Sequence, residues 1–417
     1  MRVMLTVVLG LMLTACGQRP DDTSATPAKS AAPAPRVQSW TLPTQTGASA
    51  PDLRQAPDGR LLLSWLQAEG EDAHRFLFAA ADAQGAWQHD PRVIAADRPL
   101  FANWADTPHI LATPDGALWA HWLQRVGKRG GTYDVVLARS ADAGQTWATE
   151  AKVNDDGTET EHGFATMWAE GQDRIGIAWL DGRHTSGHGH GSDHGGGPMT
   201  LRTATFDAAL GRHDESERDA STCDCCQTTS AWVDGGPMLA WRDRTQDEIR
   251  DIVMTHRKNG EWQKETVVHA DGWHIAGCPV NGPSMAAHDG RVLIAWFTGA
   301  QDTPSVRIAM NTDGAFGAMQ EVDSGADVLG RVAVALDARQ AWVAWLREEA
   351  GQQSVMLARY TPDLARELER TEVAKLQARG RVSGFPKLIS DGATAWMVWT
   401  DVEGDATLIR GARIRAN

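Results

Sequence analysis

The sequence predicts an all-β fold in which seven similar units form a ring. Seven times along the 417 residues, an aspartate-centred turn is followed by a short apolar run that ends in tryptophan: Trp65, Trp122, Trp179, Trp241, Trp296, Trp345 and Trp399. Successive tryptophans are 49 to 62 residues apart, a spacing typical of β-propeller blades. Short apolar runs between glycine-containing turns also favour strands over helices. We therefore expect a seven-bladed β-propeller, with a six-bladed ring and one stray repeat as the alternative.

Each unit offers four strand positions. The first strand precedes the turn, the second runs into the tryptophan, the third is of the type 133–139, and the fourth is of the type 264–268. The turn often contains Asp-Gly, as at Asp58-Gly59, which supplies the positive φ angles of a β-hairpin at low cost. The units therefore read as four-stranded antiparallel blades.

The two ends of the repeat array predict how the ring closes. The last unit stops near Ile414 after its third strand, and residues 37–42 form a strand with no unit of its own. Pairing the two would remove the exposed edges and close the ring, so we expect one propeller domain over residues 37–417. One segment conflicts with this register, because Leu364, Leu368 and Leu376 have helical spacing. They predict an inserted helical turn within residues 362–379.

The amino-terminal residues predict that the protein is localised outside the cytoplasm. Arg2, an apolar segment over residues 5–13 and Leu13-Thr14-Ala15-Cys16 have the order of a secretory signal, and the last four residues resemble a bacterial lipobox. Residues 1–16 are then a lipoprotein signal peptide and Cys16 is the lipidated residue, with a plain secretory signal as the alternative. Residues 17–36 are rich in Ala, Pro, Ser and Thr and form a flexible tether. Gly17 favours the outer membrane, so we expect a lipid-anchored, periplasm-facing envelope protein.

Charge excludes one class of partner. The formal net charge is −14, whereas nucleic-acid binding needs a surplus of lysine and arginine to neutralise phosphates. We expect a monomer whose partners are the membrane, through its lipid, and a metal ion or a glycan.

One motif carries a family resemblance. Ser140-Ala-Asp142-Ala-Gly144-Gln-Thr146-Trp147 resembles the Asp box, or BNR repeat, of the sialidase superfamily, and residues 81–87 resemble a degraded copy. The box is a folding device, in which the serine and aspartate satisfy turn amides and the tryptophan plugs the blade edge. The chain therefore looks like a divergent lipoprotein member of that superfamily.

The resemblance implies a catalytic set that this chain does not clearly supply. A working sialidase requires a tyrosine nucleophile with a glutamate partner, an arginine cluster for the substrate carboxylate and an aspartate acid. The chain has only two tyrosines, Tyr133 and Tyr360, and neither is expected at the mouth of the inner strands, so the nucleophile is not evident. The remaining weak catalytic candidates are Asp106, Arg183, Arg242 and Arg331.

Two cysteine motifs distinguish the chain from a sialidase. Cys223-Asp224-Cys225-Cys226 leads into the inner strand of the fourth unit, and His274 and Cys278 lead into that of the fifth. Adjacent blades would present these side chains beside the central channel, and in an extended segment Cys226 would point away from Cys223 and Cys225. His162 occupies the equivalent position of the third unit. Thiolate and imidazole ligands suit copper or zinc, and thiolates favour the soft ions.

A histidine-rich loop is expected on the same face, because it connects the second and third strands of its unit. It contains the weaker ligand candidates His184, His188, His190 and His194. Three other interpretations stay open: two structural disulfides among four cysteines in an oxidising envelope, a redox-active cysteine pair, and a solvated His-Gly loop that binds metals weakly.

The sequence therefore leaves two functional hypotheses. The first is a lipid-anchored propeller that binds a soft transition metal, with copper favoured, through a Cys/His cluster on its top face. The second is an exo-α-sialidase-like glycoside hydrolase or glycan-binding propeller whose cysteines form disulfides. If the protein is an enzyme, the two hypotheses predict a metal-dependent oxidoreductase and a glycosidase, respectively. A protein-interaction platform is the default role of a propeller.

Overall fold

The computed structural model describes residues 36–416 except for residues 71, 128–130, 148, 186–196 and 313. The described residues belong to one compact unit, Ala34–Asn417. The predicted signal peptide, Cys16 and the tether up to residue 35 lie outside the described residues.

The first four blades follow one another along the chain. Blade one consists of β2 (Ala48–Gln55), β3 (Leu61–Ala68), β4 (His74–Ala81) and β5 (Arg92–Ala95). Blade two consists of β6 (His109–Ala112), β7 (Leu118–Arg125), β8 (Tyr133–Ser140) and β9 (Thr149–Lys152). Blade three consists of β10 (His162–Glu170), β11 (Arg174–Asp181), β12 (Thr200–Phe206) and β13 (Arg212–Asp219). Blade four consists of β14 (Thr229–Val233), β15 (Gly236–Arg242), β16 (Ile252–Lys258), β17 (Glu261–Trp262) and β18 (Thr266–Val267).

Three more blades complete the ring. Blade five consists of β19 (Ser284–His288), β20 (Arg291–Thr298), β21 (Ser305–Thr312), β22 (Ala315–Phe316) and β23 (Gln320–Ser324), with the 3₁₀ turn η1 (Ala300–Asp302) between β20 and β21. Blade six consists of β24 (Val328–Leu336), β25 (Ala341–Glu349), β26 (Gln352–Tyr360) and β27 (Glu367–Lys375), followed by the 3₁₀ turn η2 (Gly380–Ser383). Blade seven consists of β28 (Lys387–Ser390), β29 (Thr394–Glu403), β30 (Ala406–Arg415) and the amino-terminal strand β1 (Arg36–Ser39).

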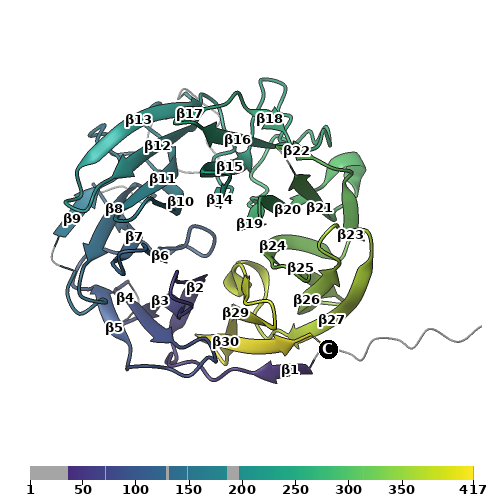
Figure 1. The fold of residues 1–417 in the computed structure, drawn as a ribbon, viewed down its shortest axis with the longest axis horizontal. Helices are drawn as coiled ribbons and strands as arrows, with labels where there is room; N and C mark the ends of the chain where they lie inside the picture. Colours follow the sequence, from purple (N-terminus) through teal and green to yellow (C-terminus); the bar gives the residue numbers. More distant parts are fainter. Residues whose placement is uncertain are drawn as a thin grey trace, which may run out of the picture. The chain divides into compact units, whose positions relative to one another are not determined.

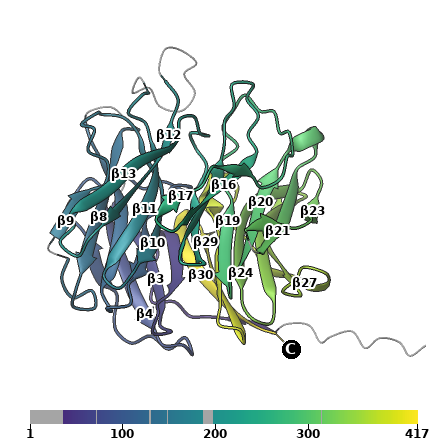
Figure 2. The ribbon, with the colours of Figure 1, turned by 45° about the horizontal axis from the view of Figure 1, so that its top comes forward.

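The ring closes as the sequence predicts. β1 pairs antiparallel with β30, with Val37 opposite Ile414. The inner strands of neighbouring blades contact one another all the way round, including β28 with β2, and Figure 1 shows these strands surrounding a central space. The tilted view in Figure 2 shows neighbouring blades packed against one another. The seven-bladed prediction is therefore confirmed, and the six-bladed alternative is wrong.

The repeated residues account for the blades. Each of the seven repeat tryptophans lies on the second strand of its blade and is at most 5% exposed, so each one fills the space between two sheets. The hairpin from β14 to β15 turns at Asp234 and Gly235, whose φ angles are +47° and +78°. Two successive positive φ angles match the right-handed twist of the flanking strands, which is why Asp-Gly is used there.

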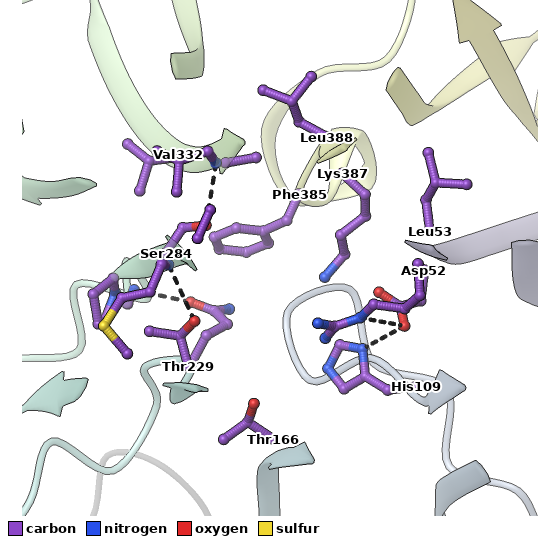
Figure 3. Close-up of a pocket in the computed structure, with 18 of the residues that line it drawn as sticks. Asp52, Leu53, His109, Thr166, Thr229, Ser284, Val332, Phe385, Lys387 and Leu388 are labelled. Carbon is purple, nitrogen blue, oxygen red and sulfur yellow. Dashed lines mark hydrogen bonds and ion pairs between the residues drawn. The ribbon is translucent and has the colours of Figure 1, made fainter. Parts of the chain in front are cut away.

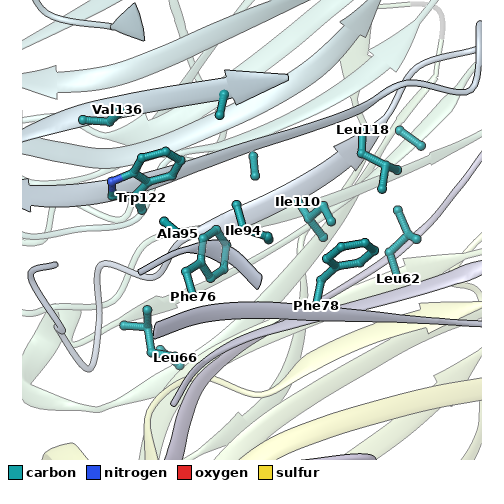
Figure 4. Packing of buried hydrophobic residues seen from close by; sticks show 14 of the residues in the cluster. Leu62, Leu66, Phe76, Phe78, Ile94, Ala95, Ile110, Leu118, Trp122 and Val136 are labelled. Atoms are coloured by element: carbon teal, nitrogen blue, oxygen red, sulfur yellow. The ribbon is translucent and has the colours of Figure 1, made fainter. Parts of the chain in front are cut away.

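Apolar side chains fill the spaces between adjacent blades. Figure 4 shows one such cluster, in which Phe76 and Phe78 of blade one pack with Trp122 and Leu118 of blade two. All four side chains are fully buried. Because every blade presents such faces to both neighbours, the ring is stabilised blade against blade.

The predicted helical turn within residues 362–379 is wrong. Residues 367–375 form β27, which pairs with β26. Leu364 and Leu376 flank this strand and are buried in two different clusters, so their helical spacing reflects two separate contacts rather than one helix face. The nearby 3₁₀ turn η2 begins only at Gly380.

The Asp-box segment forms the turn between β8 and β9. The hydroxyl of Ser140 donates to Asp142 Oδ1 at 2.7 Å and accepts from Gly144 N at 2.8 Å. Asp142 Oδ1 also accepts from Thr146 N at 2.9 Å. These hydrogen bonds, led by that from Thr146, lower the pKa of Asp142 to about 2. Trp147 packs against the cluster between blades one and two, so the segment acts locally as a folding device.

Candidate metal centre

The first cysteine motif brings three thiols together. It lies in the loop from β13 to β14, which we call the cysteine loop (residues 220–228). Cys223, Cys225 and Cys226 are 1 to 2% exposed. Cys223 Sγ lies 3.9 Å from Cys225 Sγ and 3.1 Å from Cys226 Sγ, and the three sulfur atoms lie within 4.8 Å of one another. None of the four described cysteines is in a disulfide.

The expectation that Cys226 points away from the other two cysteines is wrong. That expectation assumed an extended segment, in which neighbouring side chains alternate in direction. The chain instead turns at Asp224 and Cys225, which places the sulfur of Cys226 beside that of Cys223. All three thiols therefore face one point.

The second motif approaches the first from the adjacent blade. Cys278 lies in the loop that leads into β19 and is exposed, and its side chain hydrogen-bonds with Cys225. Gln227 joins the two loops, because its Oε1 accepts from Gly282 N at 2.9 Å. A Cβ on Gly282 would lie only 2.1 Å from Gln227 O, so the close approach requires glycine.

Arginines surround the thiols. Arg250 Nη1 donates to Cys223 Sγ at 3.3 Å, and the buried Arg242 lies nearby. Hydrogen bonding with Cys225 and Cys226, together with the charges of Arg242 and Arg250, holds the pKa of Cys223 well below its usual value. The pKa of Cys225 is raised by its hydrogen bonds to the other thiols, and that of Cys226 chiefly by burial.

A carboxyl group lies within the same loop. Burial, opposed by the Arg244 charge and reinforced by Cys223, raises the pKa of Asp224 to about 6. Asp224 Oδ2 lies 3.4 Å from Arg244 Nη1. A negative charge on the thiols therefore disfavours a negative charge on Asp224, and the reverse also holds. The nearby arginine side chains offset both charges.

Of the predicted histidine ligands, those among the described residues do not lie with the three thiols. His274 and His184 are exposed, and neither belongs to the thiol cluster. His188, His190 and His194 lie outside the described residues. The base of the histidine-rich loop does reach the cysteine loop, since Thr222 N donates to Met199 O at 2.9 Å.

His162 belongs to a different cluster. It is fully buried, and its Nε2 lies 3.2 Å from Asp156 Oδ1 and 3.8 Å from Asp181 Oδ1. Asp181 is already occupied by Arg183, which donates from Nε to Oδ1 at 2.7 Å and from Nη2 to Oδ2 at 2.8 Å. This bidentate pair makes the cluster a buried ion network rather than an open cation site.

The three arginines named as weak catalytic candidates each contact different groups. Arg183 pairs with Asp181 and with Glu215, at 3.3 Å. Arg242 is 1% exposed and donates to three backbone carbonyl groups on blades four and five. Arg331 donates to Ser383 Oγ at 2.7 Å. None of the three lines the central cavity that the described residues form.

Sequence reasoning missed a contact of Tyr133. As predicted, this residue begins a third strand, yet its hydroxyl donates to Glu161 and lies 3.5 Å from Asp106 Oδ2. Tyr133 is 1% exposed, and burial, reinforced by Glu161, raises its pKa well above 10. The only sequence signal was the position of Glu161 directly before an inner strand. The hydroxyl is thus held as a neutral donor.

Sequence reasoning also missed the central cavity. It has a volume of about 300 Å³ and is lined by the inner strands and the loops leading into them. Asp106 lines it, together with the charged side chains of Asp52, Arg54 and Lys387. No motif had singled out the last three.

Comparisons with known proteins give the fold. No family model matches the chain, and no curated protein matches its sequence. A phage phi92 endosialidase is similar over 92% of this chain and 69% of its own length, with 8% identity and a TM-score of 0.50. A protein of unknown function from Dyadobacter fermentans is similar over 89% of this chain and 95% of its own, with 13% identity and a TM-score of 0.49.

A third structure extends this comparison. An α-L-arabinanase from Penicillium chrysogenum is similar over 75% of this chain and 93% of its own, with 14% identity and a TM-score of 0.46. At such identities likeness concerns the fold alone. The chain is thus a seven-bladed β-propeller, similar in fold to an endosialidase. None of the helices in the described part of the chain has the length and apolar content to span a membrane.

Proposed function

We propose that this propeller binds one soft transition metal ion, with copper favoured over zinc, through Cys223, Cys225 and Cys226. The observation that carries the proposal is three buried thiols whose sulfur atoms lie within 4.8 Å of one another. A metal–sulfur bond of about 2.3 Å places the sulfur atoms of a trigonal or tetrahedral site about 3.8–4.0 Å apart. The separation of Cys223 and Cys225, 3.9 Å, matches this spacing. Cys226, at 3.1 Å from Cys223, would have to move outward by less than about 1 Å.

The charges around the thiols support a bound cation with thiolate ligands. Three thiolates and a cuprous ion carry a net charge of about −2, which Arg242 and Arg250 would offset. The three sulfur atoms suit a cuprous ion, whereas zinc prefers four ligands in a closed structural site. Cys278, next to Cys225, would be the fourth ligand in that case.

We further propose that the protein acts in the cell envelope, anchored by a lipid on Cys16. The support is the lipobox-like Leu13-Thr14-Ala15-Cys16 and the tether after it. Radiolabelled palmitate should be incorporated into the wild-type chain and not into a Cys16→Ser variant. Equal labelling of both chains would refute the anchor.

Elemental analysis of the purified, untagged protein, together with a thiol count after denaturation, tests the metal site. We expect about one copper or zinc ion per chain and free thiols at the four propeller cysteines. A Cys225→Ser/Cys278→Ser double variant should lose the metal and keep its β-sheet circular dichroism. His274→Ala should retain the metal, because the structure does not place that ring with the thiols. Full metal loading of the double variant, or protein without metal and without free thiols, would overturn the proposal.

The contact of Tyr133 with Glu161 and Asp106 favours a second candidate function, hydrolysis or binding of glycans. These are the residue types that the sialidase resemblance requires. Two observations argue against glycan hydrolysis: Tyr133 is buried, and each of the three candidate arginines already contacts other groups of the protein. Turnover of a fluorogenic sialoside that is lost in Asp106→Asn would establish the activity. Clean protein without any turnover would refute hydrolysis.

A further inference from the structure

The central cavity, which Gln227 and Thr228 of the cysteine loop help to line, contains charged side chains that the metal proposal does not use. Asp52 and Arg54 come from β2, His109 from β6 and Lys387 from β28. Figure 3 shows Lys387 reaching into the space between Phe385 and the pair formed by Asp52 and His109. A cavity of about 300 Å³ is large enough for a small organic ligand.

Asp52 is already balanced. Its side chain is 1% exposed, and Oδ2 lies 3.2 Å from Arg54 Nε and 3.1 Å from His109 Nδ1. The same oxygen accepts from Ile110 N at 3.4 Å. Burial lowers the pKa of His109 to about 4, despite the nearby Asp52 carboxylate, so this ring is neutral at pH 7. Asp52 and Arg54 therefore cancel each other's charge.

Lys387 has no such partner among the described residues. Its only hydrogen bond there is to Thr107 Oγ1, at 3.5 Å, and no carboxylate forms an ion pair with it. The other acid in the cavity, Asp106, has its carboxylate against Tyr133 and Gly163. Burial, only partly offset by the Asp52 charge, lowers the pKa of Lys387. The ammonium group thus has spare donors directed into the cavity and no ion pair with a described carboxylate.

The remaining cavity wall is partly apolar. Phe385, Met285, Leu53 and Val332 line it and are 2 to 8% exposed. Apolar side chains beside a lysine that forms no ion pair with a described residue suit a ligand that has both an anionic end and an apolar body.

We propose that the central cavity binds a small organic carboxylate, with the carboxylate on Lys387 and the apolar body against Phe385. The charge-assisted hydrogen bond would give Lys387 the carboxylate partner that it lacks among the described residues. The proposal is independent of the metal site, because the two sites share no ligating side chain.

A panel of carboxylates tests this site in the purified protein. Acetate, hexanoate, benzoate and phenylacetate are titrated at pH 7 and constant ionic strength, with hexanamide, benzamide and phenylacetamide as neutral counterparts. Thermal denaturation and calorimetry follow binding. We expect hexanoate, benzoate or phenylacetate to raise the Tm, and the matching amide to bind at least about tenfold more weakly.

Two variants locate the binding. Lys387→Met should reduce carboxylate affinity at least about tenfold, whereas Lys375→Met, an exposed lysine on the outer strand β27, should leave it unchanged. No Tm shift with any carboxylate, or equal affinity for acid and amide in the wild-type protein, would overturn the proposal. Equal affinity of Lys387→Met and wild type would also overturn it. The comparison of acid with amide uses wild-type protein alone and stands even if Lys387→Met does not fold.

Discussion

Replacing Arg250 with methionine should raise the pKa of the Cys223 thiol. Arg250 Nη1 lies 3.3 Å from Cys223 Sγ, and its side chain is only 3% exposed. Methionine retains much of the side-chain volume and removes the charge. Glu248, the other partner of Arg250 at 2.7 Å, still has Arg244 at 2.7 Å. The change therefore acts mainly on the thiolate.

The magnitude follows from the one hydrogen bond that is lost. A hydrogen bond to a charged group contributes about 1.5–3 kcal/mol, and one pKa unit corresponds to about 1.4 kcal/mol. Losing it should therefore destabilise the thiolate relative to the thiol by about 1.5–3 kcal/mol, which raises the thiol pKa. The hydrogen bonding with Cys225 and Cys226 and the charge of Arg242 remain, so the change should not greatly exceed this range.

The assay is the ultraviolet absorbance of the thiolate as a function of pH, measured on metal-free protein. Arg250→Lys serves as the matched control, because it keeps a positive charge near Cys223 and should shift the titration less than methionine does. An unchanged thiolate titration in Arg250→Met, with a native circular dichroism spectrum, would refute the assigned role of Arg250.

Three further predictions concern the ring. Gly144→Ala should destabilise the protein by about 2–4 kcal/mol, because φ is +81° and the new Cβ would lie 2.1 Å from Phe78 Cζ. The control Gly59→Ala has φ +86° and open space around the new Cβ, so it should cost only the backbone strain of about 1–2 kcal/mol. Equal denaturation midpoints for the two variants would contradict the predicted clash at Gly144. The folded-state pKa of His109 is lowered from 6.5 to about 4, so the contribution of this residue to stability is lost as the pH falls from about 6.5 to about 4. His109→Gln should therefore flatten the dependence of Tm on pH over this interval. An unchanged slope would contradict the role assigned to His109. Deleting residues 36–39 exposes the edge of β30 and should lower the Tm and promote self-association on size-exclusion chromatography, whereas a monomer of wild-type Tm would show that β1 does not stabilise the ring.

The sequence by itself predicted seven blades, with six as the alternative, and the way the ring closes. Strand alternation, Asp-Gly turns and the repeated tryptophan depend on residues close together in the chain. The strand at residues 37–42 and the last strand, near Ile414, each lacked a partner, so the sequence predicted that they pair with each other. The mistaken helical turn shows the limit of such patterns, because Leu364 and Leu376 contact different clusters.

The tertiary structure alone decided how the functional side chains are combined. A turn at Asp224 reversed the expected direction of Cys226, since a change at a single residue moves a side chain to the other face of an extended segment. His162 joined an ion network instead of the thiols. Lys387 and Asp52 line the same cavity only because the last blade packs against the first. Such contacts depend on the curvature of the ring, which brings together side chains from strands far apart in the sequence and leaves no local pattern to predict them.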